Sequence, residues 1–222
     1  MFDRFAAACL IDQMSMEDVL AFGASLFEGH RIRLRHSTEE DFELLQAWWL
    51  DPQVMVLQST NAVSLRSRES IISMFKTWSQ ISDSGFGYSI VRKQDNKLIG
   101  HIALWGITAK DRCASLGILI DKSVWGLGYG TEALMLALHY GFSELNLHRI
   151  QLEVSASNER AIQSYRKAGF REEGRRRQAF FRNGHWQDQV QMAILAEEFL
   201  SSSKPRDNRD RSSSVPEENG EA

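Results

Sequence analysis

The chain has 222 residues, of which 43% are hydrophobic and 25% charged. This composition suits one globular domain with a sizeable core, and it excludes a fibrous or wholly disordered protein. The net charge is -3: residues 1–29 hold one arginine against five acids, and residues 201–222 hold four basic residues against five acids. The region between them carries a mild positive excess, which would assist an acidic cofactor but excludes the strongly basic surface typical of nucleic-acid binding.

Neither a disulfide framework nor a membrane span is predicted. Cys9 and Cys113 are the two cysteines, too few for a secreted disulfide scaffold. No apolar run approaches the roughly 18 residues that a spanning helix needs. The short apolar run over 5–11 lacks the cleavage site of a signal peptide. We therefore expect a cytoplasmic protein without membrane or nucleic-acid partners.

An appended segment precedes the first strand. Residues 1–29 include a helix predicted over 16–27, in which Ser15 and Asp18 have the spacing of a capping box. Residues 31–36 then alternate apolar and basic side chains, which predicts an amphipathic strand. The folded domain is expected to begin with this strand.

Two helices follow. Ser37 or Thr38 caps the first, acids fill its first turn, and Asp51-Pro52 is expected to stop it. The second, predicted over 67–82, carries a stripe of apolar residues at helical spacing. Both helices are candidates for one wall of a cleft.

Three antiparallel strands are expected next. They are predicted over 87–93, 98–105 and 113–120, with a tight hairpin turn over 95–97 between the first two. The third strand is apolar and leads directly into a glycine-rich turn.

That turn begins the stretch around which the chain is organised. Gly126, Gly128 and Gly130 leave room for a tight turn or for a closely bound ligand. Apolar residues then recur at three- and four-residue steps up to residue 145, so this segment buries one face of a helix. Unpaired N–H groups and the positive end of the helix dipole favour phosphate binding at such a helix start. The stretch therefore predicts an anion-binding loop.

Single residues exclude two common phosphate loops. A Walker loop would need lysine after Gly130, and a dinucleotide fingerprint from Gly126 would need glycine or alanine where Thr131 stands. The remaining pattern, Trp125-x-x-Gly128-x-Gly130, resembles the pyrophosphate loop of the Gcn5-related N-acetyltransferases (GNAT). Trp125 departs from the Arg or Gln usual at the first position. The form Trp-Gly-x-Gly-Tyr-Gly-Thr-Glu-Ala is typical of the ribosomal-protein-alanine N-acetyltransferase branch, the RimJ/RimL type.

The rest of the chain alternates strands and one helix. The elements are predicted over 149–155, 158–168, 171–181 and 189–195, and Asn183-Gly184 marks a turn between the last two. Beyond residue 200 the composition is polar and charged, which predicts disorder. The expected organisation is an extension over 1–29, a GNAT acetyltransferase domain over 30–200 and a tail over 201–222.

A second signature lies in the helix. Asn158-x-x-Ala-x-x-x-Tyr165-x-x-x-Gly169-Phe170 resembles the same family, at the expected distance after the glycine loop. Two ordered signatures are more specific than either one alone. The resemblance implies an α/β (α+β) fold with a mixed, mostly antiparallel sheet flanked by helices and split at its centre, the acyl-CoA N-acyltransferase fold.

The resemblance also implies the chemistry. Acetyl-CoA would be the co-substrate without a metal, and its thioester would lie along the strand over 116–120, where a bulge leaves a backbone N–H for the oxyanion. Tyr165 looks like the acid that protonates the leaving thiolate, and Asn158 like a residue that positions pantetheine or acetyl. Cofactor contacts are expected at Ile118, Leu119, Ile120, Trp125, Gly126, Leu127, Gly128, Tyr129, Gly130, Thr131, Asn158 and Lys167.

Structural roles for these residues stay open beside the chemical ones. Tyr165 could be a core residue with a backbone partner, and Asn158 only a helix cap. For the general base, Glu153 is the candidate, with Asp188, His148 and His185 as weaker ones. An α-amine, with a pKa near about 7.7–8.0, needs less help from a base than lysine at about 10.4.

The expected reaction is acetyl transfer by direct attack of a primary amine. The branch resemblance implies a protein N-terminal α-amine as acceptor. A polyamine, an amino acid or an aminoglycoside stays open as a small-molecule acceptor, because the same fold serves all of them. The alternative of another class is a non-catalytic CoA-binding module. A monomer or a homodimer is expected.

Overall fold

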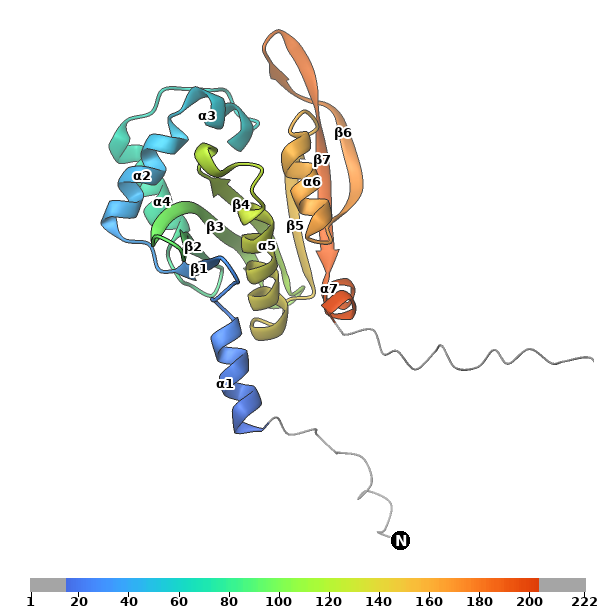
Figure 1. The fold of residues 1–222 in the computed structure, drawn as a ribbon. Coiled ribbons are helices and arrows are strands. Elements are labelled where there is room, and N and C mark those ends of the chain that lie inside the picture. Colours follow the sequence, from blue (N-terminus) through green and yellow to red (C-terminus); the bar gives the residue numbers. More distant parts are fainter. Residues whose placement is uncertain (1–14, 204–222) are drawn as a thin grey trace, which may run out of the picture.

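The computed structural model describes residues 15–203. Its centre is a seven-stranded sheet with the order β1-β2-β3-β4-β5-β7-β6. All neighbouring strands are antiparallel except β4 and β5, which confirms the predicted mixed sheet. The strands are β1 (Ile32–Arg35), β2 (Gly85–Arg92), β3 (Lys97–Thr108), β4 (Cys113–Ile120), β5 (Arg149–Ser155), β6 (Arg171–Arg182) and β7 (His185–Leu195) (Figure 1).

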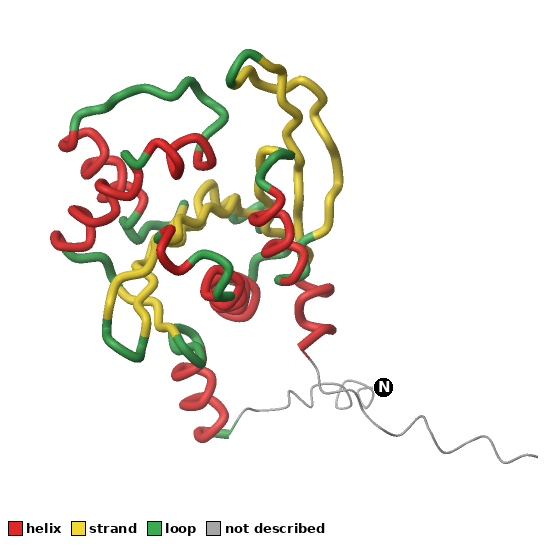
Figure 2. Tube along the Cα trace, turned by 45° about the horizontal axis from the view of Figure 1, so that its top comes forward, coloured by secondary structure: helices red, strands yellow, loops and turns green. Residues whose placement is uncertain are grey.

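Helices cover both faces of the sheet (Figure 2). They are α1 (Met16–Ser25), α2 (Glu39–Trp49), α3 (Pro52–Gln58), α4 (Arg68–Trp78), α5 (Tyr129–His139), α6 (Glu159–Lys167) and α7 (Ala196–Ser203), with short turns η1 (Lys122–Val124) and η2 (Tyr140–Glu144). One apolar core joins the sheet to α5, α6 and α7. A smaller core, which includes Phe75 and Leu119, joins its other face to α2, α3 and α4.

The sheet splits between its two parallel strands. β4 pairs with β5 over Cys113 to Ser115 only, whereas its pairing with β3 continues to Ile120. The edge of β4 that faces β5 therefore lacks a strand partner over 116–120. The expected bulge at this place is wrong, because the register shift between β3 and β4 lies between Trp105 and Thr108. Divergence of two strands, instead of an extra residue, is what leaves this edge free.

Two helices were not expected from the sequence. Asp51-Pro52 ends α2 as predicted, but it also begins α3, with the Asp51 side chain as cap and Pro52 in the first turn. At the other end of the domain, α7 continues the chain to Ser203. The rest of the predicted tail, over 204–222, lies outside the described residues.

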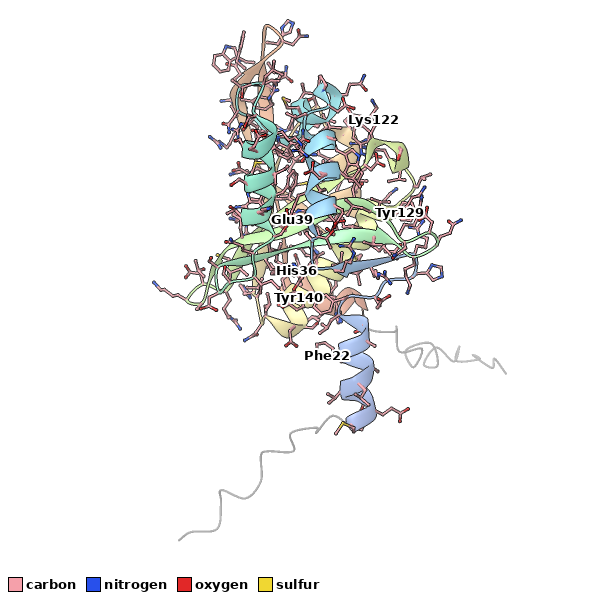
Figure 3. All side chains as sticks on the ribbon, turned by 90° about the vertical axis from the view of Figure 1, so that its left-hand side faces the viewer. Phe22, His36, Glu39, Lys122, Tyr129 and Tyr140 are labelled. Atoms are coloured by element: carbon pink, nitrogen blue, oxygen red, sulfur yellow. The ribbon has the colours of Figure 1, made fainter. Side chains whose placement is uncertain are left out.

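The N-terminal extension contains the predicted helix. Ser15 and Asp18 form both hydrogen bonds of the capping box that starts α1. Figure 3 shows α1, with Phe22 labelled, extending from the body of the domain. Phe22 contacts the ring of His139 on α5, at 5.7 Å between centroids. Residues 1–14 lie outside the described part, and none of the described helices is long and apolar enough to cross a membrane.

Candidate active site

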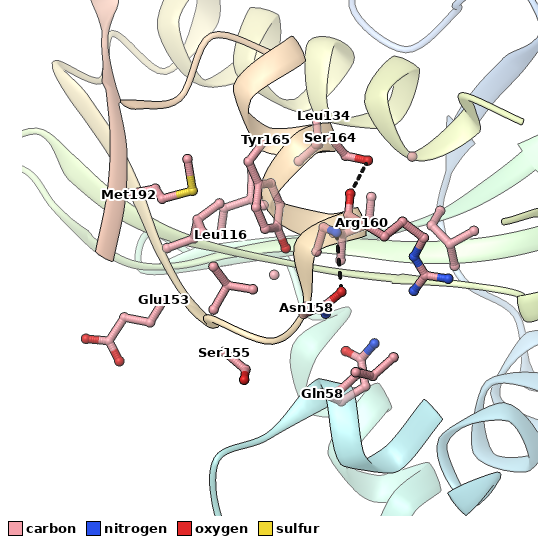
Figure 4. A pocket seen from close by; sticks show the side chains of 18 of the residues that line it. Gln58, Leu116, Leu134, Glu153, Ser155, Asn158, Arg160, Ser164, Tyr165 and Met192 are labelled. Atoms are coloured by element: carbon pink, nitrogen blue, oxygen red, sulfur yellow. Dashed lines mark hydrogen bonds between the residues drawn. The ribbon is translucent and has the colours of Figure 1, made fainter. Parts of the chain in front are cut away.

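A cavity of about 810 Å³ occupies the split between β4 and β5. Leu116 and Ile118 of β4 and Leu134 of α5 line it on one face of the sheet. On the other face it is lined by Trp105 and Ser115, which are paired across β3 and β4. Because both faces contribute, two molecules can meet inside it from opposite sides. Figure 4 shows part of its lining.

The glycine turn begins α5 at one end of this cavity. Gly128 is the N-cap residue with φ of 85°, a left-handed conformation that favours glycine. No side chain caps the helix, and within the described chain no backbone N–H from 126 to 131 donates a hydrogen bond. Gly126, Gly128, Gly130 and Thr131 all line the cavity. These unpaired donors and the helix dipole make the turn suited to a phosphate group.

Trp125 precedes this turn and is held in place. Its indole N–H donates to the carbonyl of Ile120 at 2.8 Å. The guanidinium carbon of Arg160, on α6, lies 3.3 Å from the centre of the Trp125 ring. Both residues line the cavity. At position 125, where the loop pattern usually has Arg or Gln, this chain has an aromatic ring, and an arginine from α6 stacks on that ring.

Tyr165 lies on the buried face of α6, with 9% of its surface exposed. Burial raises the pKa of its hydroxyl to about 12, and the positive charge of Arg160 opposes that rise. Among the described residues the hydroxyl has no hydrogen-bond partner, although the residue lines the cavity (Figure 4). The structure therefore holds a protonated hydroxyl beside β4 that is free to donate.

Asn158 begins α6. Its side-chain oxygen accepts the N–H of Ala161 at 3.3 Å, so the residue is a helix cap. It also lines the cavity, and its amide NH₂ has no acceptor in the described part of the chain. Capping uses the oxygen alone, which leaves the amide group able to donate to a ligand.

Glu153 is the candidate base that reaches the cavity. Its carboxylate accepts the amide N–H of Gln191 at 3.2 Å and lies 3.8 Å from Arg176. Asp188 instead accepts the backbone N–H of Gln178 at 2.9 Å, which is a structural role.

The other two candidate bases stand apart from the cavity. His148 follows α5 and precedes β5, and His185 is exposed at the turn between β6 and β7. Neither lines the cavity. No group of three or more metal-binding side chains is present among residues 15–203.

The structure brings most of the sequence-predicted cofactor residues together and separates three from them. Leu119 points into the core under α2 and α4, Leu127 is exposed beside the turn, and Tyr129 lies under Arg31. The residues that line the cavity are Ile118, Ile120, Trp125, Gly126, Gly128, Gly130, Thr131, Asn158 and Lys167.

Sequence reasoning did not identify Arg160 or the wall formed by residues 56–60. Arg160 stands seven residues before Lys167 and so on nearly the same helix face, a spacing that could have singled it out. Residues 56–60 belong to α3 and the segment after it. Because α3 was not predicted, the sequence could not place these residues at the cavity.

Comparisons with known proteins agree with this geometry. Residues 31–171 match the family described as Acetyltransferase (GNAT) domain. An uncharacterized N-acetyltransferase of Bacillus subtilis, YoaA, is 32% identical over 72% of this chain and 90% of its own length. Spermidine N(1)-acetyltransferase of Escherichia coli K12 is 37% identical over 50% of this chain and 59% of its own length.

A solved structure extends the similarity to the whole fold. Spermidine N-acetyltransferase from Vibrio cholerae, in complex with CoA and spermine, superimposes with a TM-score of 0.68 at 27% identity. The superposition covers 77% of this chain and 98% of that protein.

Proposed function

The chain belongs to the GNAT family of acetyl-CoA-dependent N-acetyltransferases, and we propose that its acceptor is the primary amine of a small molecule, with a spermidine-like polyamine as the first candidate. The similarity to spermidine acetyltransferases carries this proposal. It favours the small-molecule alternative over the protein N-terminus that the glycine loop suggested. Membership of the RimJ/RimL branch stays a prediction.

The cavity fits acetyl-CoA as co-substrate. The unpaired N–H groups from 126 to 131 would bind its pyrophosphate. Asn158 and the free edge of β4 would bind the pantetheine and the thioester. The amide groups of pantetheine could hydrogen-bond the backbone of β4, as an extended peptide pairs with a free sheet edge. The thioester supplies an activated acetyl group, and the protein has to position it against the amine.

Residues of this chain then assist direct attack by the amine. A neutral amine has to reach the carbonyl, and Glu153, directly or through water, would accept its proton. A backbone N–H on the free edge of β4 would stabilise the oxyanion. Tyr165 would protonate the departing thiolate. With its pKa near 12 the hydroxyl stays protonated at neutral pH, but proton donation to a thiolate of pKa about 8.5 is uphill by about 3.5 pKa units.

Charged side chains in the cavity affect which amine acceptor it can bind. Glu153 and Glu173 line the cavity, so a polyamine could meet carboxylates there. Glu173 is paired with Arg149 at 2.6 Å, and Glu153 lies 3.8 Å from Arg176. These arginines leave no excess of negative charge, an observation that favours a protein N-terminal α-amine as the second candidate.

Thiol release from acetyl-CoA tests the proposal. Spermidine, an amino acid, an aminoglycoside and short peptides with free N-termini would be compared as acceptors at equal concentration. The proposal expects turnover with spermidine and little with the peptides. Turnover with the peptides alone would establish the second candidate. Silence with every acceptor, together with CoA binding measured by calorimetry, would point to a CoA-binding module.

A further inference from the structure

A cation on α6 lies at the cavity without an acidic partner. Arg160 stands in the first turn of α6, two residues after the cap Asn158. Its backbone carbonyl accepts the Ser164 hydroxyl, but within residues 15–203 its guanidinium makes neither a hydrogen bond nor an ion pair. The residue as a whole is exposed to solvent, and partial desolvation lowers the pKa of its guanidinium.

The stacking on Trp125 fixes the direction of this guanidinium. A distance of 3.3 Å between the guanidinium carbon and the ring centre means that the two planes lie nearly face to face. The donors of an arginine radiate in the guanidinium plane, so stacking covers a face but leaves the N–H groups free. The indole is itself anchored to Ile120. Arg160 therefore presents an oriented fork of donors, the geometry that suits phosphate oxygens.

Two other cations near the glycine turn, Arg31 and Lys122, are already neutralised. Arg31 bonds the Glu132 carboxylate at 2.9 Å and the Leu127 carbonyl at 2.9 Å. Lys122 lies 3.5 Å from Asp51. Arg160 differs from both of them. It stacks on Trp125, the residue directly before the turn with the unpaired N–H groups, and no carboxylate among the described residues pairs with it.

We propose that Arg160, stacked on Trp125, binds the pyrophosphate of acetyl-CoA together with the backbone N–H groups of the glycine turn. The inference rests on the acetyl-CoA-dependent activity proposed above. Arg160 of α6 would then supply the positive charge that Trp125, at the first position of the loop, cannot supply. Cofactor binding would then connect α6 to the end of β4 across the split in the sheet.

Calorimetric titration of CoA into the full-length protein tests this assignment without catalysis. Arg160→Gln removes the charge and the fork, and the loss of charged hydrogen bonds is expected to weaken CoA binding about 10- to 100-fold. Arg166→Gln is the matched control. Arg166 is an exposed arginine of the same helix, paired with Glu172 at 3.2 Å, and its loss should change CoA affinity by less than about threefold.

Two truncated ligands identify the group that is bound. Dephospho-CoA keeps the pyrophosphate, so Arg160→Gln should weaken it by the same factor as CoA. Pantetheine has no phosphate, and the substitution should leave its binding unchanged. A loss confined to CoA would assign Arg160 to the 3′-phosphate and overturn the pyrophosphate assignment. An equal loss with pantetheine would show a general disturbance of the cavity and also overturn it.

CoA binding by the wild-type protein distinguishes a failure of the role given to Arg160 from a failure of the proposed function. If it binds CoA tightly and Arg160→Gln binds equally well, the role of Arg160 is wrong while the proposed function stands. If the wild type does not bind CoA, both are wrong. Arg160→Lys keeps a charge without the planar fork, and full affinity in this variant would contradict the stacked geometry.

Discussion

Polar side chains gather in two regions of this molecule, and their hydrogen bonding differs. Beneath α2 and α4, a polar cluster made of Arg35, Ser37, Asp41, Ser79, Ser89 and His101 is connected from end to end. The Ser89 hydroxyl donates to Asp41 at 2.8 Å and lies 2.9 Å from the Ser37 hydroxyl, and Ser79 bonds both Ser37 and His101. In the cavity between β4 and β5, by contrast, the Tyr165 hydroxyl and the Arg160 guanidinium have no partner among the described residues.

The difference separates groups that hold the fold from groups available to ligands. A buried polar group without a partner costs stability, so groups that are fully bonded inside the protein contribute to the fold. The polar cluster links α2 and α4 to β2 and β3 in this way, with Arg35 donating to Asp41 at 2.9 Å. Groups in the cavity lack such partners and can bind a substrate. Substitutions in the two regions should therefore affect different properties.

Removal of the Tyr165 hydroxyl should have the largest effect, and it should fall on catalysis. Tyr165→Phe is expected to lower kcat about 100- to 10,000-fold, because the leaving thiolate loses its proton donor. Steady-state thiol release would measure this change. CoA affinity and the free energy of unfolding should stay close to wild type, since no partner inside the protein is lost. An unchanged kcat with lower stability would instead make Tyr165 a core residue.

Removal of the Asp41 carboxylate should show the opposite behaviour. Asp41→Ala leaves Arg35 and Ser89 without their shared acceptor and should lower the free energy of unfolding by about 2–3 kcal/mol. The loss stays below that of a fully buried pair because the Arg35 side chain is 33% exposed. Urea denaturation measures it, and kcat should not change at temperatures where the variant is folded.

Glu39 supplies the matched control for this variant. It lies on the same helix and pairs with Lys76 at 2.7 Å on the surface, so Glu39→Ala should cost less than about 1 kcal/mol. An equal loss from both substitutions would contradict the special role given to the polar cluster.

The pH dependence of stability should identify the same cluster. Burial lowers the pKa of His101 to about 4, so the unfolded chain binds a proton that the folded chain does not accept. Stability from this group is present above the unfolded pKa of about 6.5 and is lost as pH falls toward 4. The free energy of unfolding should be about 2 kcal/mol lower at pH 5 than at pH 7.5.

Substitution of His101 tests whether this residue causes the pH dependence of the free energy of unfolding. His101→Gln should flatten the curve between pH 7.5 and 5, whereas His36→Gln, at an exposed histidine, should keep the wild-type slope. A slope that survives in His101→Gln would show that other groups cause it.

Local patterns in the sequence predicted most of the elements that build the cavity. Glycine spacing predicted the turn before α5, and the cap Asn158 predicted the start of α6. These features depend on neighbours in the chain, so sequence alone contains them. Pro52 shows the limit of such patterns, because the same residue that ends α2 is also favourable in the first turn of α3.

Contacts between distant residues could not be predicted in this way. The end of β4–β5 pairing after Ser115 depends on how two halves of the sheet diverge. Arg160 of α6 contacts Trp125, which precedes α5, and Ser89 of β2 contacts Asp41 of α2. No periodicity links these residues. Their hydrogen bonding, and with it the difference between the two regions, becomes visible only in the folded structure.

Hydrogen–deuterium exchange with and without CoA tests this difference most directly. The account predicts that CoA slows amide exchange in residues 126–131 and at the start of α6, where donors lack partners in the free protein. Exchange around Asp41, Ser89 and His101 should not change. Unaltered exchange at the glycine turn under saturating CoA, with protection of the polar cluster instead, would contradict the account.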